Sequence, residues 1–162
     1  MSLDRSPLPL RFDVDGLRAD IDALAPRDWV PHFNTAGYDG DWSGAALRSV
    51  GGLPGRLYPD PTASAAFADT PLLARCPHTA AALATLRCPL LAVRFLRLGP
   101  GSRIKPHTDL DLGFDDGEVR LHVPVSGGAG VEFLLDGRPV EMDEGEVWYL
   151  NLNLRHSVEN RG

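Results

Sequence analysis

The chain has 162 residues, a length typical of one domain, and we expect a single domain that buries a sizeable core. Its 16 basic and 22 acidic residues give a net charge of −6, which argues against a duplex nucleic acid partner because such proteins present a basic face. No apolar run approaches the length of a membrane span, so no membrane partner is expected. The composition favours small molecules or peptides as substrates and leaves the oligomeric state open.

The N-terminus and the cysteines favour a cytoplasmic location. The first residues lack the basic and apolar regions of a signal peptide. The two cysteines, Cys76 and Cys88, flank a short helix-like segment, and we expect neither a disulfide nor a zinc site from them. Both observations fit a protein of a reducing compartment.

The first ninety residues are predicted to form a mixed region that supports a sheet. Apolar residues recur at helical spacing from Val14 to Leu24 and a proline follows at position 26, which predicts a helix over residues 14–25. A second, alanine-rich helix is expected over residues 79–86, ahead of Pro89. The apolar stripe of the first helix should pack on the sheet.

The segment between the two helices offers candidates for a substrate pocket. From residue 29 to residue 49, short expected strands alternate with glycine-rich turns. Ligand sites combine an apolar wall with a few placed polar groups. The candidate residues are His32, Asn34, Trp42 and Arg48. The alternatives are core packing for Trp42 and a structural role for His32.

From residue 90 onward the pattern is that of an antiparallel β protein. Asp136-Gly137 is a two-residue hairpin signal between two β-prone segments. Residues 110–118 are acidic and are expected to form a solvated loop, with a lid over a site as the alternative. The expected strands cover residues 90–98, 119–125, 131–135, 138–142 and 147–151.

His107, Asp109 and His156 form the pattern that indicates chemistry. Residues i and i+2 of a strand project from the same face, so His107 and Asp109 can bind one ion together. The 46 residues between Asp109 and His156 suffice for about four strands, so a rolled antiparallel sheet could bring His156 back to this pair. Two histidines and one carboxylate hold non-haem Fe(II) in oxygenases and leave positions open for a co-substrate and O₂.

The ordered set of motifs from Pro100 to Asn160 resembles the aspartyl/asparaginyl β-hydroxylase-like family of Fe(II)- and 2-oxoglutarate-dependent oxygenases. The matching elements are PG-x5-H-x-D, R-x-H-x-P, the E-G-E-V-W turn and strand, and H-S-V-x-N. The resemblance implies a mainly β fold, a double-stranded β-helix or jelly-roll/cupin-like barrel, with a few supporting helices in the N-terminal half. Residues 91–162 would form the metal-binding barrel core, and residues 1–90 its support.

The same resemblance implies an activity and roles for individual residues. It implies hydroxylation of an amino acid, or of an aspartyl/asparaginyl-type residue in a peptide, with O₂ and 2-oxoglutarate consumed and succinate and CO₂ produced. It further implies that His107, Asp109 and His156 bind the iron and that Arg120 and His122 line the 2-oxoglutarate pocket. A surface ion pair for Arg120 and a hydrogen-bonded core position for His122 are the alternatives.

Two departures from the family concern 2-oxoglutarate. The family normally has an arginine about ten residues after its last iron-binding histidine, where it pairs with the far carboxylate. Here the sequence reaches Gly162 first, so we expect the natural chain to extend further; a move of this role to Arg94, Arg97 or Arg120 is the second explanation. In the family, a polar side chain that helps to hold 2-oxoglutarate occupies the position of Leu96. Arg94 lies on the same strand face and is the candidate replacement for this contact. A surface salt bridge is the alternative role for Arg94.

Two other functions remain open. The spacing from Gly101 to Asp109 and the turn at residues 144–146 also resemble cupin motifs, which would indicate a metal-dependent enzyme without 2-oxoglutarate. Cupins normally show two histidines and a glutamate in the first motif, and this chain has Asp109 where the second histidine would fall. A non-catalytic barrel that binds a metal or a metabolite is the other alternative, and the missing C-terminal arginine is its main support.

Overall fold

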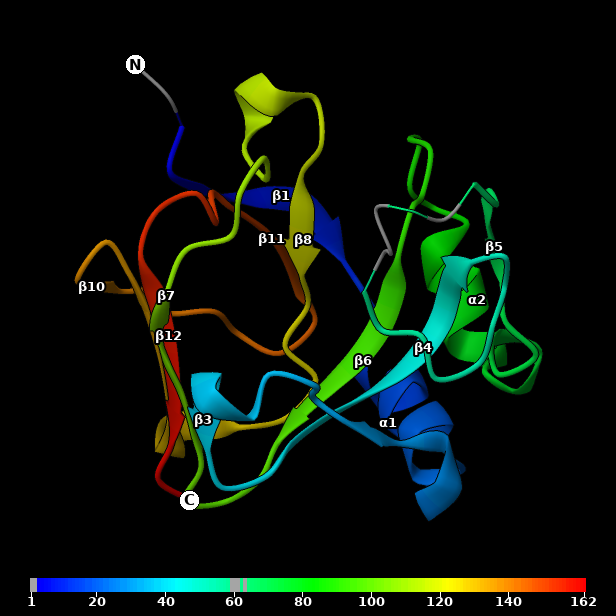
Figure 1. Cartoon of the computed structure of the whole chain (residues 1–162), viewed down its shortest axis with the longest axis horizontal. Helices are drawn as coiled ribbons and strands as arrows, with labels where there is room; N and C mark the ends of the chain where they lie inside the picture. Colours follow the sequence, from blue (N-terminus) through cyan, green and yellow to red (C-terminus); the bar gives the residue numbers. More distant parts are fainter. Residues whose placement is uncertain (1–2, 59–61, 63) are drawn as a thin grey trace. The chain divides into compact units, whose positions relative to one another are not determined.

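The structure, a computed structural model, describes residues 3–58, 62 and 64–162. Within them the chain forms twelve strands, two α-helices and five short 3₁₀-helices, so the protein is mainly β as expected (Figure 1). The chain divides into two compact units, which we call unit 1 (Met1–Val14, Asn34–Asp41 and Leu98–Gly162) and unit 2 (Asp15–Phe33 and Trp42–Arg97). None of the helices in the described residues has the length and apolar character needed to cross a membrane.

Unit 1 consists of two antiparallel sheets. They form a jelly-roll-like β-sandwich, which agrees with the expected fold class, although the described strands do not close into a barrel. In the three-stranded sheet the order is β1 (Arg5–Arg11), β11 (Glu146–Leu150) and β8 (Arg120–His122). In the five-stranded sheet the order is β10 (Arg138–Pro139), β9 (Val131–Leu135), β12 (His156–Asn160), β7 (Arg103–His107) and β3 (Tyr38–Asp39).

The hydrophobic core of unit 1 lies between these two sheets. Alternate residues of a strand face the same side, so Phe133 and Leu135 of β9 and Trp148 and Leu150 of β11 contribute to one apolar cluster. Leu135 and Leu150 have no exposed surface, and Leu152 retains 1%. This core fixes the strands from which the candidate metal ligands project.

The first half of the chain contributes two strands to unit 1. β1 pairs with β11, with Pro7 opposite Trp148, and β3 pairs with β7. The Arg5 guanidinium donates hydrogen bonds to the carbonyls of Leu135 and Pro139, at 2.8 and 3.1 Å, which ties β1 to the hairpin of the other sheet. The assignment of support to residues 1–90 and of the barrel to residues 91–162, within a single domain, stays a prediction.

Unit 2 is built around the long strand β4. β4 (Trp42–Val50) pairs with β2 (Val30–Pro31), β5 (Phe67–Asp69) and β6 (Val93–Leu98), and eight of its nine residues are buried. The helices α1 (Val14–Asp22) and α2 (Pro77–Leu83) occur where helices were predicted. α1 begins at the predicted residue and ends three residues early, and α2 begins two and ends three residues before its predicted bounds. Buried Ala45, Leu47, Leu72, Cys76 and Phe95 form its core cluster.

Short 3₁₀-helices occur in both units. They are η1 (Pro26–Asp28), η2 (Thr35–Gly37), η3 (Leu73–Arg75), η4 (Phe114–Asp116) and η5 (Gly128–Gly130).

Asp20 links the two helices of unit 2. Its carboxylate, 3% exposed, accepts hydrogen bonds from the backbone N–H of Thr79 at 2.6 Å and from the Thr79 hydroxyl at 2.7 Å. Asp20→Ala leaves both buried donors unsatisfied, so we expect a loss of about 1–3 kcal/mol in the free energy of unfolding. Asp22→Ala removes an exposed carboxylate of the same helix and should change the free energy of unfolding by less than about 0.5 kcal/mol. Equal shifts of the two variants in urea unfolding would contradict this role.

The two cysteines should differ sharply in reactivity. Cys76 has no exposed surface, and burial, followed by the nearby Asp20 carboxylate, raises the pKa of its thiol to about 11. Cys88 is exposed, and both thiols are free. Because the thiolate is the reactive species, one fast-reacting thiol is expected in the folded protein near neutral pH. In the reaction with a disulfide reagent, Cys88→Ser should lose this fast phase and Cys76→Ala should retain it. The opposite pattern would contradict the burial of Cys76.

Candidate metal centre

His107, Asp109 and His156 converge at one end of the five-stranded sheet of unit 1. His107 is the last residue of β7 and His156 the first of β12, and the two are direct partners across these antiparallel strands, which lie side by side in Figure 1. Asp109 follows in the turn after β7, where its N–H donates to the carbonyl of Leu152 at 2.9 Å. One potential ligand atom from each of the three side chains lies within 4.8 Å of the other two.

Both imidazoles of this triad are oriented by their own backbone. His107 Nδ1 lies 2.8 Å from the carbonyl oxygen of Lys105, and His156 Nδ1 lies 2.9 Å from that of Leu154. A carbonyl oxygen only accepts hydrogen bonds, so Nδ1 carries the proton in each neutral ring and Nε2 offers its lone pair. The Nε2 atoms lie 3.7 Å (His107) and 3.8 Å (His156) from the carboxylate oxygens of Asp109. Metal-binding histidines are held in this way, with one nitrogen donating to an oxygen and the other directed at the ion.

His156 is the most deeply placed member of the triad. It is 6% exposed, and burial lowers the pKa of its imidazole below the ordinary value, as do electrostatic interactions with the His107 ring and the Arg120 guanidinium. The Leu154 carbonyl and the Asp109 carboxylate act in the opposite direction and do not reverse the shift. The neutral imidazole is therefore favoured at neutral pH, and this is the form that binds a metal ion.

The strand β8 brings Arg120 into contact with the triad and His122 into contact with Phe133. Arg120 Nη1 donates to Asp109 Oδ2 at 3.0 Å, so this arginine contacts a candidate ligand directly. The His122 ring lies edge-on to Phe133 at a centroid distance of 5.8 Å, and Phe133 in turn lies parallel to the His156 ring at 6.2 Å. The proposed roles of Arg120 and His122 in binding 2-oxoglutarate stay predictions.

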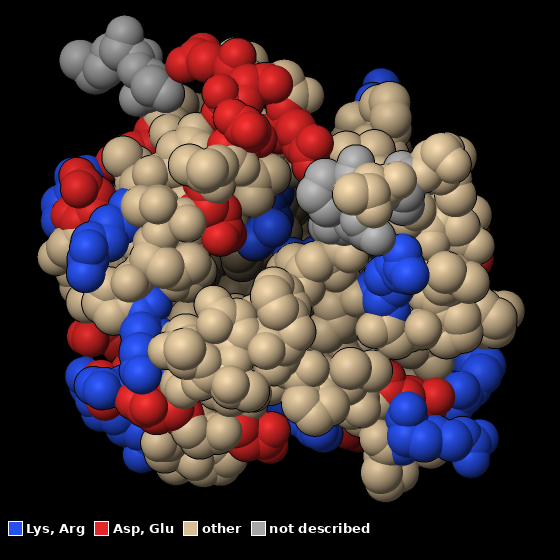
Figure 2. Space-filling view, viewed as in Figure 1, with Lys and Arg blue, Asp and Glu red and all other residues tan. Residues whose placement is uncertain are grey.

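The acidic loop between Asp109 and β8 is held by several hydrogen bonds. The backbone N–H of Phe114 donates to the Tyr149 hydroxyl at 2.9 Å, and the Asn153 amide donates to Asp116 at 2.7 Å. Acidic side chains gather over this loop at the upper edge of Figure 2. Leu110 and Phe114 are 82% and 70% exposed, which agrees with a solvated loop.

The two predicted arginines of unit 2 have contacts within that unit. Arg94 donates to the carbonyl of Leu57 at 3.0 Å, and its guanidinium lies 4.4 Å from the centre of the Tyr58 ring. Arg48 donates to Asp69 at 2.9 Å and also to the carbonyls of Phe67 and Leu90. These contacts support the sheet of unit 2, and the co-substrate role of Arg94 and the substrate role of Arg48 stay predictions.

The other candidates for substrate binding have different surroundings. His32 is buried and stacks on Trp42, with ring centroids 3.7 Å apart and planes within 6°. Asn34 belongs to unit 1 and is exposed at the start of η2. The stacked pair forms part of the packing of unit 2, and substrate binding by these three residues also stays a prediction.

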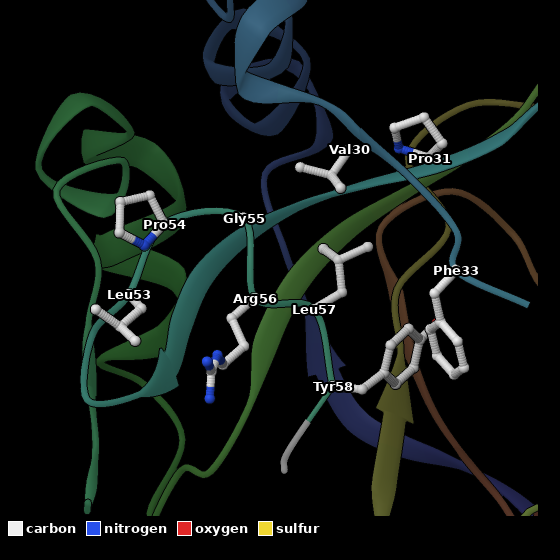
Figure 3. Close-up of a pocket in the computed structure, with 9 residues that line it drawn as sticks. All are labelled: Val30, Pro31, Phe33, Leu53, Pro54, Gly55, Arg56, Leu57 and Tyr58. Atoms are coloured by element: carbon white, nitrogen blue, oxygen red, sulfur yellow. The ribbon is translucent and has the colours of Figure 1, made fainter. Parts of the chain in front are cut away.

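A groove of about 610 Å³ in unit 2 was not anticipated from the sequence. Figure 3 shows the rings of Phe33 and Tyr58 close together, 5.5 Å between centroids, with the Arg56 side chain on the same segment as Tyr58. This volume lies within the range of small-molecule sites. The groove is lined by Val30, Pro31, Phe33, Leu53, Pro54, Gly55, Arg56, Leu57 and Tyr58, and so by none of the predicted substrate residues.

Comparison with known proteins identifies the family. The model of the aspartyl/asparaginyl β-hydroxylase family matches residues 11–162. The chain belongs to the aspartyl/asparaginyl β-hydroxylase family. Membership confirms the resemblance seen in the motifs and supports a hydroxylase function, and the histidine and aspartate triad is compatible with iron binding. A search of curated proteins finds no match for the chain.

Some parts of this β-hydroxylase site were missed in the sequence. The carbonyls of Lys105 and Leu154, which fix the two imidazoles, are main-chain groups and carry no sequence signature. Phe133 could have been found, because it is two residues from Leu135 on the predicted strand and so shares its inward face. The direct contact of Arg120 with Asp109 required the relative position of the two sheets.

Proposed function

We propose that this β-hydroxylase family member is an Fe(II)- and 2-oxoglutarate-dependent oxygenase that hydroxylates an amino acid, either free or as an aspartyl/asparaginyl-type residue of a peptide. The observation that supports this most strongly is the triad, in which two oriented Nε2 atoms and one carboxylate converge. Two histidines and one carboxylate on one side of a metal are typical of non-haem Fe(II) oxygenases. Three protein ligands leave room for a co-substrate and O₂, whereas a structural metal site fills its coordination shell.

The chemistry of the donors fits Fe(II). The triad offers imidazole nitrogen and carboxylate oxygen, while both cysteines lie in unit 2 and are not part of it. His107, Asp109 and His156 would hold the metal, and Phe133 would keep water from one face of His156. When bound, Fe(II) would activate O₂, and oxidation of 2-oxoglutarate to succinate and CO₂ would supply two electrons, with one oxygen atom entering succinate and the other the substrate. The chain itself would hold the substrate carbon near the metal and exclude competing reactions.

The co-substrate is proposed to bind beside the triad. His122 is a candidate contact because its ring meets Phe133, which lies against His156. Arg94 remains a second candidate for binding 2-oxoglutarate, on the basis of the sequence alone. The substrate carbon to be hydroxylated would then approach from the side left open by the three ligands.

The proposal is tested by supplying the purified protein with Fe(II), 2-oxoglutarate and O₂ together with free amino acids and with peptides that contain aspartate or asparagine. We expect succinate formation to rise with one class of substrate, and its product to gain one oxygen atom by mass spectrometry. Asp109→Ala should abolish both. A hydroxylated product without succinate would instead favour a cupin-like enzyme, and metal binding without any O₂ consumption would favour a binding protein.

A further inference from the structure

An ion pair joins the two sheets of unit 1 directly at the candidate metal centre. Arg120 lies on β8 of the three-stranded sheet, and Asp109 lies in the turn after β7 of the five-stranded sheet. Arg120 Nη1 and Asp109 Oδ2 are 3.0 Å apart, and the two side chains are 28% and 29% exposed. A partly buried, charge-assisted hydrogen bond of this length is stronger than one between neutral groups, and solvent screens it less than an exposed pair.

We propose that Arg120 is a positioning residue for Asp109, which holds the carboxylate in the orientation in which its two oxygens face the two imidazoles. Asp109 Oδ1 lies 3.7 Å from His107 Nε2, and Oδ2, which accepts the hydrogen bond from Arg120, lies 3.8 Å from His156 Nε2. With one oxygen fixed, rotation of the carboxylate about its last bond is restricted. Asp109 would then present its carboxylate to the ion in one fixed orientation. This inference rests on the proposed metal binding at the triad and assigns Arg120 a different task from the co-substrate contact implied by the family resemblance.

The sign of the expected effect separates positioning from simple electrostatics. A guanidinium next to the site repels a divalent cation, so loss of its charge alone would tighten metal binding. Loss of an outer partner that orients a ligand weakens metal binding instead, typically by about 10- to 100-fold. Weaker binding after removal of Arg120 can therefore be attributed to the lost orientation of Asp109.

The test compares metal affinities of the full chain in the absence of 2-oxoglutarate. Apoprotein is titrated with Co(II), which reports its coordination by visible absorption, and with Fe(II) under anaerobic conditions. For Arg120→Gln we expect about 10- to 100-fold weaker binding and a changed Co(II) spectrum. Arg120→Lys, which keeps the charge and loses the planar donor geometry, should show a smaller loss in the same direction. The matched control is Arg103→Gln, which removes the exposed pair with Asp39 on β7 and should leave the affinity unchanged.

The outcomes distinguish this inference from the proposed function. Unchanged or tighter binding by Arg120→Gln, with only a higher KM for 2-oxoglutarate, would overturn the positioning role and return Arg120 to co-substrate binding. Circular dichroism checks that each variant is folded, and if Arg120→Gln is not, the affinity of Arg120→Lys decides by the same criterion. A wild-type protein that binds neither Co(II) nor Fe(II) would overturn the proposed function and the inference together.

Discussion

His156→Gln should reduce Fe(II) affinity by more than the roughly 10- to 100-fold that follows loss of an outer partner, and should abolish hydroxylation. The glutamine side chain is close in size to histidine and so limits the disturbance at a position that is 6% exposed. It does not place a nitrogen lone pair where Nε2 lies, 3.8 Å from the Asp109 carboxylate. Anaerobic Fe(II) titration and succinate formation measure the two effects.

His78→Gln is the matched control for this substitution. His78 is exposed on α2 of unit 2 and is not a member of the triad. Its replacement should leave Fe(II) affinity and turnover unchanged. Equal affinities of the wild type and His156→Gln would mean that iron binds elsewhere or not at all, which would remove the basis of the proposed function.

Leu135→Ala should give a large loss of stability, about 2–5 kcal/mol in the free energy of unfolding. Leu135 has no exposed surface, lies in the core between the two sheets of unit 1 and is the strand partner of His156. The substitution removes apolar contacts and leaves a cavity that a tightly packed core fills only in part. We also expect weaker metal binding, because β12 loses the packing that fixes His156.

Leu110→Ala provides the matched change on the surface. Leu110 follows Asp109 directly but is 82% exposed, so its truncation should alter stability by no more than about 0.5 kcal/mol. Urea unfolding of the two variants measures the difference between them. Similar urea midpoints for Leu135→Ala and Leu110→Ala would show that Leu135 is not part of a close-packed core.

The strands of unit 1 were predictable where a local signal fixed them. β9 covers the predicted residues 131–135, because Asp136 and Gly137 take left-handed conformations, with φ of 52° and 71°, as a two-residue hairpin turn requires. β8 is shorter than predicted and ends at His122; Pro124, two residues later, has no N–H to donate to a neighbouring strand. The pairing of β1 with β11 was not predicted, since it joins residues far apart in the sequence without a local signal.

Helix ends were less predictable than helix positions. α1 ends at Asp22, although the apolar spacing continues to Leu24. The next residues form a tighter turn, in which the N–H of Leu24 donates to the carbonyl of Ile21, before Pro26 begins η1. The spacing therefore identified the face that packs in the core, and local hydrogen bonding decided where the helix ended.

The candidate site was predictable to different extents. His107 and Asp109 lie close together as predicted, although β7 ends at His107 and Asp109 lies beyond the strand on which the spacing argument placed it. The closeness of His156 was a hypothesis, because the 46 intervening residues allow many paths. The family motifs selected the histidine that the structure places next to this pair, and they also pointed to Arg120. Its contact with Asp109 depends on how two sheets pack, and sequence periodicity carries no information on that.

An anaerobic titration of the apoprotein with Fe(II) and 2-oxoglutarate tests the proposed chemistry most directly, because a keto acid chelated to Fe(II) gives a visible charge-transfer band. We predict that the band forms only with both components in the wild type, is absent in His156→Gln and persists in His78→Gln. Fe(II) binding without any band in the wild type would contradict the use of 2-oxoglutarate at this triad.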